Sequence, residues 1–362
     1  MSLRQIKDQD TALRLLRNIK QRGRIPSGLL FWGPGGVGKR TTALQFAKAV
    51  NCRESRDDAC DACLSCRKND HQNHADVMVL APTGSGRVIK VDAVEGVIET
   101  SFYKPVEAGL RVVVFEDADR MTEPAQNHFL KTLEEPPSRS TFVLLTEQPR
   151  RLLPTIRSRC HRVCFGLLRQ QTVHELLDER CDIAPEQARV IAALAQGSMA
   201  RALDLATTDR YQTAFEYIHR LALGEDPLLV GEGFGAQIEA IKKRIIAEVN
   251  QTGAGNEEKP EDQPGVALDE EEAAALIRGL VRRELLEYMR IFDAWYRDEL
   301  VYGLTRDSRI VYNIDRIGQL PKDVNTPRQV GKLQAIAVAG KYIERNLKES
   351  RVFRDLFFAL TP

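Results

Sequence analysis

The residues GPGGVGKR, at positions 33–40, stand between a short apolar run, residues 28–32, and a segment with helical spacing, residues 41–50. Glycines let backbone N–H groups converge on phosphate oxygens, a helix N-terminus adds positive potential, and Lys39 supplies a point charge. A glycine-rich turn before a helix is the structural alternative. The strand, the spacing, the lysine and the helix together predict a phosphate-binding loop.

One residue of this loop departs from the usual pattern. The eighth position is normally Ser or Thr, whose hydroxyl binds Mg²⁺, but Arg40 stands there. Thr41 comes next, yet one step along a helix turns the side chain by about 100°, so Thr41 does not replace the missing ligand. Arg40 also brings a second cation to the place of the metal. We expect the loop to keep its capacity for ATP, ADP or another anion and to lack Mg²⁺-assisted hydrolysis.

Two acidic residues follow a second apolar run, residues 111–115. In ATPases with this kind of loop, an aspartate here orders the Mg²⁺ shell and a following glutamate polarises the attacking water. Here the order is reversed, Glu116 and then Asp117. Catalytic geometry tolerates errors of only about an ångström, so we interpret the pair as a degenerate active-site position. Asp119 is equally well explained as a surface acid.

The apolar runs predict the fold class. A third run, residues 141–145, resembles those at residues 28–32 and 111–115. All three are short, continuous and bounded by turn or charged residues, as in strands of a parallel sheet that is covered on both faces. Because helical segments lie between them, we predict an α/β fold with right-handed crossovers over residues 1–165.

The rest of the chain has helical character. A chain of 362 residues suggests two or three domains. After residues 1–165, we expect a small helical domain over residues 166–207, with a break near Gly197, and a helical bundle over residues 208–362. Residues 251–269 are polar, acidic and rich in Gly and Pro, which predicts a mobile loop.

Within the predicted bundle, apolar residues that step by three or four form one helical stripe, which we expect in the core. They are Ile277, Val281, Leu285, Tyr288, Phe292 and Trp295. Thr326 followed by Pro327 is typical of a helix cap and of a proline in the first helical position. The helix that they open is expected to run toward Leu347.

Composition excludes several classes of protein. Lys and Arg number 52 and Asp and Glu 51, a formal net charge of +1, so the whole chain does not hold nucleic acid by bulk charge. Its apolar runs fall far below the roughly 18 residues that span a bilayer, and residues 1–8 lack the apolar stretch of a signal peptide. Seven cysteines, an odd number, fit a disulfide scaffold poorly, so we expect a reducing, cytoplasmic setting.

Four of the cysteines are clustered with the spacing C-x7-C-x2-C-x2-C. They are Cys52, Cys60, Cys63 and Cys66. Two short C-x2-C steps and a fourth thiolate can close a tetrahedron around Zn²⁺ and leave no open position, which predicts a structural zinc site. An iron–sulfur centre is the alternative. His71 and His74 follow closely, but four cysteines suffice as ligands.

Further motifs carry a family resemblance. KTLEEPP occupies residues 131–137, Thr146 follows the third apolar run, and a Ser-Arg-Cys motif occupies residues 158–160. With the four-cysteine insert, these motifs resemble the clamp-loader subunits of bacterial DNA polymerase III, which are of the AAA+ class. The resemblance covers residues 1–205. It implies an AAA+ nucleotide-binding domain with a zinc insert, a helical lid domain and a C-terminal collar domain.

Within this family, three departures distinguish between the ATP-hydrolysing gamma/tau subunit and the delta' subunit. Arg40 replaces the metal-binding hydroxyl, Glu116-Asp117 inverts the acidic pair, and Ala200 stands where hydrolysing subunits carry a second-sensor arginine. Arg201 is one step further along the helix and is expected to point elsewhere. The chain therefore resembles delta', a stator-like subunit of the DNA polymerase holoenzyme with absent or weak ATPase activity, and gamma/tau is the alternative.

The resemblance also implies roles for residues and partners. Arg159 of the Ser-Arg-Cys motif would be an arginine finger that reaches a neighbouring subunit's ATP site, because guanidinium is always charged, planar and multidentate toward phosphate. The degenerate nucleotide site would comprise Gly33, Gly35, Gly36, Gly38, Lys39, Arg40, Thr41, Glu116, Asp117 and Thr146. The implied partners are gamma/tau and delta-like subunits, with the sliding clamp and primed DNA reached through the complex, and no membrane.

Two other functions compete with this interpretation. An active ATPase motor of the same superfamily would tolerate Arg40 in its loop. A zinc-dependent nucleic-acid binder would use the AAA+ frame only as a scaffold. The near-neutral charge argues against the second alternative, as does the lack of interleaved aromatic and basic residues around the cysteines.

Overall fold

The computed structural model of the chain describes residues 2–83, 87–137, 139–254 and 270–361. Two compact units make up the chain. The first consists of Met1–Leu176 with Gln196–Arg201, and the second of Leu177–Ala195 with Ala202–Pro362. The helices α7 (Gln170–Arg180) and α9 (Met199–Thr207) contribute residues to both units. The predicted division into three domains stays a prediction.

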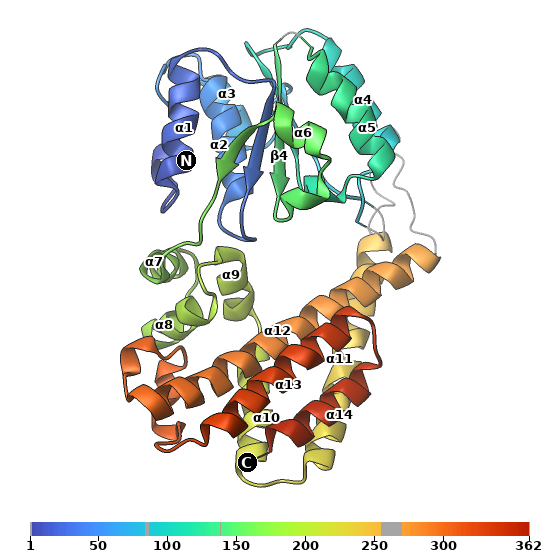
Figure 1. Cartoon of the computed structure of the whole chain (residues 1–362). Helices are drawn as coiled ribbons and strands as arrows, with labels where there is room; N and C mark the ends of the chain where they lie inside the picture. Colours follow the sequence, from blue (N-terminus) through green and yellow to red (C-terminus); the bar gives the residue numbers. More distant parts are fainter. Residues whose placement is uncertain (1, 84–86, 138, 255–269, 362) are drawn as a thin grey trace. The chain divides into compact units, whose positions relative to one another are not determined.

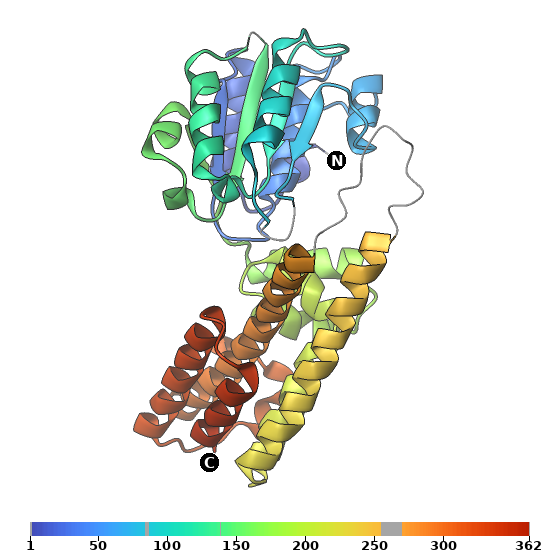
Figure 2. The same ribbon diagram turned by 90° about the vertical axis from the view of Figure 1, so that its right-hand side faces the viewer.

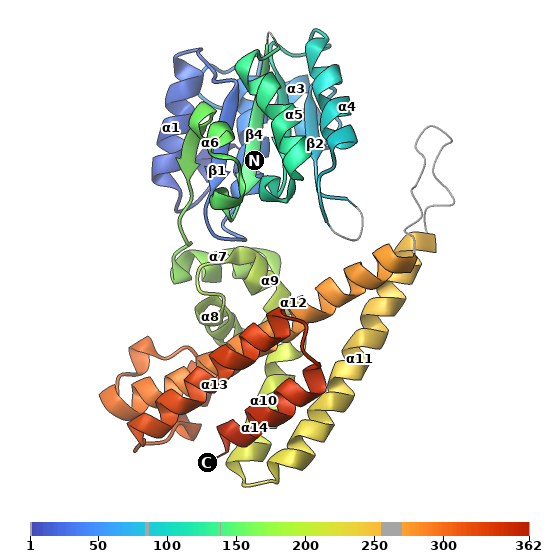
Figure 3. The ribbon, with the colours of Figure 1, turned by 45° about the vertical axis from the view of Figure 1, so that its right-hand side comes forward.

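Five parallel strands form one sheet in the first unit, in the order β2-β3-β4-β1-β5 (Figure 3). The strands are β1 (Gly28–Trp32), β2 (Val77–Leu80), β3 (Arg111–Phe115), β4 (Ser140–Thr146) and β5 (His161–Cys164). The parallel α/β sheet and its three central strands are confirmed. The two edge strands escaped sequence analysis because each has only four residues, and the β5 sequence HRVC is largely polar and exposed.

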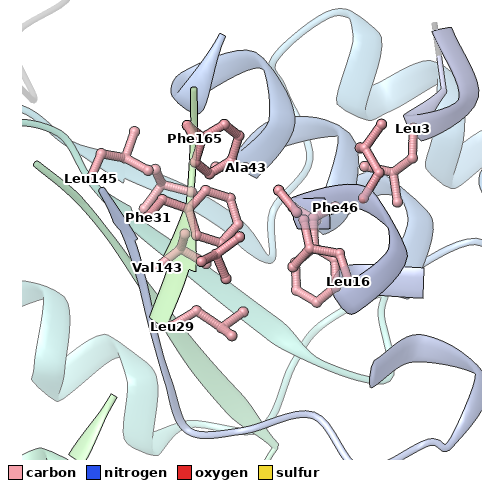
Figure 4. Close-up of a cluster of buried hydrophobic side chains, with 14 of the residues drawn as sticks. Leu3, Leu16, Leu29, Phe31, Ala43, Phe46, Val143, Leu145 and Phe165 are labelled. Atoms are coloured by element: carbon pink, nitrogen blue, oxygen red, sulfur yellow. The ribbon is translucent and has the colours of Figure 1, made fainter. Parts of the chain in front are cut away.

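Helices cover both faces of this sheet (Figure 1). They are α1 (Asp10–Gln21), α2 (Lys39–Val50), α4 (Val91–Phe102), α5 (Glu123–Glu134) and α6 (Pro154–Arg159), and α3 (Leu64–Asp70) lies beside α2. Side chains alternate between the two faces of a strand, so Leu29 and Phe31 pack toward α1 and α2, while Leu30 packs toward α4 and α5. The two faces of the sheet therefore carry separate clusters of buried apolar side chains. Figure 4 shows the cluster on the side of α1 and α2, in which the ring centroids of Phe31 and Phe165 lie 5.2 Å apart.

The sheet topology brings the predicted nucleotide residues to one edge. Trp32, the last residue of β1, pairs in register with Thr146, the last residue of β4. The N–H of Gly33 then donates to the carbonyl of Thr146 at 3.3 Å. Glu116 directly follows β3, the neighbour of β4. The loop and both strand ends therefore meet at the carboxyl edge of the sheet, where open α/β sheets bind ligands.

A buried ion pair holds the segment between α4 and β3. The carboxylate of Asp76 accepts hydrogen bonds from the backbone N–H groups of residues 106–108, at 2.7 to 2.9 Å. Nη2 of Arg111 lies 3.1 Å from Oδ1 of Asp76, and both residues are buried. Burial acts to raise the pKa of the Asp76 carboxyl, but the hydrogen bonds and Arg111 outweigh it and hold the pKa below 3.8.

Replacing Asp76 by alanine is expected to destabilise the first unit by about 3–5 kcal/mol, because Arg111 would stay buried without its partner. The stabilising effect of Asp76 is fully present above pH 3.8 and is lost as the pH falls through its lowered pKa. Urea unfolding at pH 7 measures the difference. Asp92→Ala, which removes an exposed carboxylate in α4, is the control and should cost less than about 1 kcal/mol. Equal midpoints for the two variants would contradict this prediction.

The described elements of the second unit are helical. They include α8 (Pro185–Leu194), α10 (Arg210–Ala222), α11 (Pro227–Ala254), α12 (Glu270–Thr305), α13 (Thr326–Glu344) and α14 (Glu349–Leu360). Helix α11 lies beside α14, and α12 beside α13 (Figure 2). Phenylalanine rings from three helices meet in the core: Phe234 lies 4.4 Å from Phe353, and Phe292 lies 5.9 Å from Phe357. The predicted helical character of the C-terminal part is confirmed for the described residues.

Several details of the predicted bundle differ. Along the predicted stripe, Ile277 is half-buried and the other five members are buried. Residues 251–254 form the end of α11, so the predicted loop does not begin at residue 251, and residues 255–269 lie outside the described residues. Asn325, not Thr326, caps α13: its side chain accepts from the N–H of Arg328, and the helix ends at Glu344. None of the described helices has the length and apolar character needed to cross a membrane.

Candidate functional site

The loop at residues 33–40 has a backbone that requires glycine. Gly33, Gly36 and Gly38 have φ angles of 149°, 72° and 95°, in the region that side chains disfavour. A Cβ atom on Gly33 would also lie 2.3 Å from the carbonyl oxygen of Phe165. Glycine is therefore needed both for the turn and for the close approach of the neighbouring chain.

This loop presents free hydrogen-bond donors. Within the described residues, the backbone N–H groups of residues 36–41 donate to no protein acceptor. Nζ of the buried Lys39 donates to the carbonyls of Gly33 at 2.8 Å and Pro34 at 2.5 Å. Burial lowers the pKa of Lys39, and nearby carboxylates, Glu147 first among them, act in the opposite direction. The arrangement of N–H groups and one ammonium suits phosphate oxygens.

Arg40 and Glu116 form an ion pair, in which Nε of Arg40 donates to Oε1 of Glu116. These residues occupy the eighth position of the loop and the end of β3, which hold Mg²⁺ in ATPases of this type. The arginine that replaces the expected hydroxyl therefore contacts the expected metal-binding acid. Thr41, at the following position of α2, is exposed.

The other acids at this edge are also engaged. Asp117 adopts a left-handed conformation with φ of 44°, and its carboxylate lies 3.7 Å from Nη2 of Arg87 and 3.5 Å from Nε of Arg120. The hydroxyl of the buried Thr146 donates to Oδ1 of Asp119 at 2.5 Å. Asp119, for which the sequence indicates no more than a surface acid, thus contacts a predicted site residue.

Two further segments contact the loop, one with Glu147, which the sequence did not indicate, and one with Ala200, at the expected second-sensor position. A Cβ atom on Gly35 would lie 2.4 Å from Oε1 of Glu147, and one on Gly36 would lie 2.8 Å from the methyl of Ala200. The N–H of Met199 donates to the carbonyl of Gly36 at 2.9 Å. Position 200 therefore faces the loop, and its alanine offers a methyl group where an arginine would offer charge.

Arg159 ends helix α6. Its Nη2 lies 2.7 Å from Oε1 of Glu134, the last residue of α5, and 39% of the Arg159 side chain is exposed. The next residue, Cys160, is buried against β1, where a Cβ atom on Gly28 would lie 2.8 Å from its Sγ. Burial raises the pKa of Cys160 to about 12, so its thiol is neutral. Glu134 within KTLEEPP was not identified from sequence, because its partner is distant in the chain.

The four clustered cysteines lie close together. The Sγ atoms of Cys52, Cys60, Cys63 and Cys66 are within 4.8 Å of one another, and those of Cys60 and Cys66 are 3.9 Å apart. A tetrahedral Zn²⁺ site with Zn–S bonds of about 2.3 Å requires sulfur atoms separated by about 3.8 Å. The N–H groups of Cys60 and Cys63 donate to the Sγ atoms of Cys52 and Cys60. These sulfur atoms could therefore hold a zinc ion.

The thiols influence one another electrostatically. Burial acts to raise the pKa of Cys63, but hydrogen bonds from backbone N–H groups outweigh it and lower the pKa to about 6. Burial and the neighbouring thiols raise the pKa of Cys66. A metal ion would let all four ligands carry charge together, because it compensates their repulsion.

His74 is not available to such a metal. Its Nδ1 accepts from the N–H of Asp76 at 3.1 Å, and its Nε2 lies 3.1 Å from the hydroxyl of Ser65.

Polar contacts attach the cysteine insert to the N-terminal segment of the chain. Asp58 accepts from the N–H groups of Leu3 and Arg4 at 3.2 and 3.1 Å.

Known proteins with similar sequences include subunits of DNA polymerase III. The family described as DNA polymerase III, delta subunit, matches residues 8–168. The DNA polymerase III subunit delta' of Bacillus subtilis is 34% identical over 203 residues, which are 56% of this chain and 60% of that protein. Over its first part, the chain is similar to DNA polymerase III delta' subunits. The DNA polymerase III subunit gamma/tau of Mycobacterium tuberculosis is 36% identical over 171 residues, 44% of this chain and 28% of that protein.

The predicted resemblance to delta' subunits is thereby confirmed. Gamma/tau subunits, the predicted alternative, are also similar to this chain. The chain spans 60% of the Bacillus subtilis delta' subunit, and the family match lies within the first unit. A solved structure of a DNA polymerase III, gamma subunit-related protein from Thermotoga maritima covers 95% of this chain and 98% of that one, at 18% identity and a TM-score of 0.44. A likeness this low carries no conclusion about function.

Proposed function

We propose that this chain is the non-hydrolysing, delta'-like subunit of a DNA polymerase III clamp loader. Its similarity to delta' subunits supports the family role. The observation that carries the non-hydrolysing part is the ion pair between Arg40 and Glu116. A guanidinium that contacts the strand-end carboxylate takes the place that a catalytic Mg²⁺ needs, and phosphoryl transfer depends on that ion.

Two further features support loss of hydrolysis. Asp117, where a water-polarising residue is expected, pairs with Arg87 and Arg120. Ala200 faces the loop with a methyl group, so no second-sensor charge comes from that position. A carboxylate that is engaged by two arginines is not free to orient an attacking water.

In this proposal Arg159 acts on a neighbouring subunit's ATP. Its guanidinium is partly exposed at the end of α6. Among the described residues, its polar partners are the exposed carboxylate of Glu134 and a carbonyl of its own helix. A surface ion pair of this kind costs little to exchange for a phosphate. Arg159 would thus stabilise the charge on the transferred γ-phosphoryl group in trans.

The remaining parts of the chain would serve assembly. Residues 208–362 would form the collar that joins gamma/tau and delta-like subunits, and the sliding clamp and primed DNA would be engaged through the complex. Zinc held by the cysteine cluster would be structural, since four thiolates leave no open coordination position. A cytoplasmic site of action is part of the same proposal.

The isolated chain is expected to show no ATP turnover above background in the presence of Mg²⁺, because Arg40 stands in the position of the metal. A phosphate-release assay on the purified protein measures this. Lys39→Ala is the matched variant, and its rate should equal that of the wild type. Robust turnover that Lys39→Ala abolishes would reject the proposal and favour a gamma/tau-like motor.

A further inference from the structure

We propose that the loop at residues 33–40 binds a nucleotide polyphosphate free of divalent metal, with the Arg40 guanidinium in the place of the metal ion. This inference rests on the proposed function, because it names the ligand of the same degenerate site. In ATPases with such loops, Mg²⁺ bridges the phosphates, the eighth residue of the loop and an acid at a neighbouring strand end. In this chain those two residues are Arg40 and Glu116.

The two residues do not fit a magnesium ion. Mg²⁺ demands oxygen ligands in near-octahedral geometry, and a guanidinium has donors only and no acceptor. Glu116 already accepts from Nε of Arg40. A magnesium ion there would have to break the ion pair and would then face the positive charge of Arg40.

Asp117 and Asp119 are not free to supply replacement ligands. The carboxylate of Asp117 lies between Arg87 and Arg120, and Asp119 accepts from the hydroxyl of Thr146. These two carboxylates therefore already have a cation or a donor as their partner. Binding of Mg²⁺ would require these partners to be displaced as well.

The same residues fit phosphate oxygens. The N–H groups of residues 36–41 donate to no protein acceptor among the described residues. In the part of the chain that the structure describes, Nζ of Lys39 donates only to loop carbonyls, which are weaker acceptors than phosphate. Nη1 and Nη2 of Arg40 have no hydrogen-bond partner in the described part of the chain, and half of the side chain is exposed.

Arg40 can therefore bridge protein and ligand. Its Nε stays on Glu116, while its two terminal groups donate to phosphate oxygens in the bidentate manner that guanidinium favours. The negative phosphates of free nucleotide are attracted to the positive guanidinium of Arg40. Nucleotide bound to Mg²⁺ brings a second positive charge, which Arg40 repels. The usual preference for the magnesium complex should thus be absent or reversed.

Titration calorimetry with ADP on the full-length, zinc-loaded protein tests this inference. Binding is measured without added divalent cation and again with millimolar Mg²⁺. Magnesium is omitted rather than chelated, because a strong chelator would also remove zinc from the cysteines. We expect ADP to bind without Mg²⁺, and added Mg²⁺ to leave the affinity unchanged or to weaken it.

Three variants sharpen the test. Arg40→Ser should weaken magnesium-free binding by about tenfold or more, the loss of a charge-assisted contact to phosphate, and should make binding depend on Mg²⁺. Glu116→Gln keeps Arg40 but removes its counter-charge, so magnesium-free binding should persist or tighten. Arg354→Ser, at an equally exposed arginine paired with Asp355 in the second unit, is the control and should change nothing.

Three results would overturn the inference. They are wild-type affinity that rises about tenfold or more with Mg²⁺, no ADP binding at all, and unchanged magnesium-free binding in Arg40→Ser. None of them would touch the role of Arg159, which acts at a neighbour's site. Conversely, ATP turnover by the isolated chain would reject the proposed function, whatever the calorimetry shows.

Discussion

Arg159→Ala is expected to slow hydrolysis at the adjoining ATP site of a reconstituted clamp loader by about a thousandfold or more, the usual contribution of an arginine finger. Loading of the clamp on primed DNA should fall with it. The physical reason is that charge builds up on the γ-phosphoryl oxygens in the transition state, and in the proposed role the Arg159 guanidinium would add its charge in trans to those that stabilise it. Single-turnover hydrolysis and clamp loading with the gamma/tau and delta-like subunits measure both effects.

Companion variants separate a catalytic role from a structural one. Arg159→Lys keeps the charge but loses the planar fork, so it should recover only part of the rate. Arg24→Ala, at an exposed arginine in the same unit, should load clamps normally. The thermal stability of the Arg159 variants should match that of the wild type, because the ion pair with Glu134 is exposed. Clamp loading that is indifferent to Arg159→Ala would refute the trans assignment and leave the fold intact.

Cys63→Ser is expected to abolish zinc binding and unfold the insert around residues 52–66. Apparent binding free energies of structural Zn²⁺ are about 10–16 kcal/mol at neutral pH, and much of that is folding free energy. The insert is small and has few buried apolar residues of its own, Cys63 and Cys66 among them. Metal content and hydrogen exchange of residues 52–66 measure the loss.

The control for this prediction is Cys164→Ser, because Cys164 is an exposed thiol outside the cluster. It should retain one zinc ion and normal exchange. The rest of the first unit should also keep its protection in Cys63→Ser, since the sheet has its own core on both faces. A full zinc content in Cys63→Ser would contradict the four-cysteine site, and iron with visible absorbance in the wild type would favour the iron–sulfur alternative.

The sequence predicts those elements whose pattern is local and repeated. The central strands β1, β3 and β4 are continuous apolar runs, and burial on both faces requires that pattern. The sequence does not predict the edge strands β2 and β5, because an edge strand is short and half solvated and its residues show little of the apolar strand pattern. The start of α13 was misplaced by one residue because Asn325 and Thr326 are both good caps, and only backbone geometry chooses between them.

Some residues of the candidate site are predictable from the sequence and others are not, for the same reason. Its loop residues were predicted because φ angles and N–H directions depend on nearby glycines, and the cysteine cluster was predicted because ligand spacing is short. Glu147 and Glu134 were missed because each contacts a partner brought close by the fold. Sequence alone also left open whether Arg40 would meet a carboxylate or point to solvent.

Short-range chemistry was enough to specify a phosphate cradle, a four-thiolate cluster and a parallel sheet, because glycine turns, ligand spacing and strand periodicity are properties of a few adjacent residues. Only the tertiary structure identifies which charged side chains form ion pairs. Arg40 and Glu116 are 76 residues apart in sequence, and they meet because β1, β4 and β3 place their carboxyl ends side by side. Electrostatic pairing depends on distance in space, and strand order sets that distance.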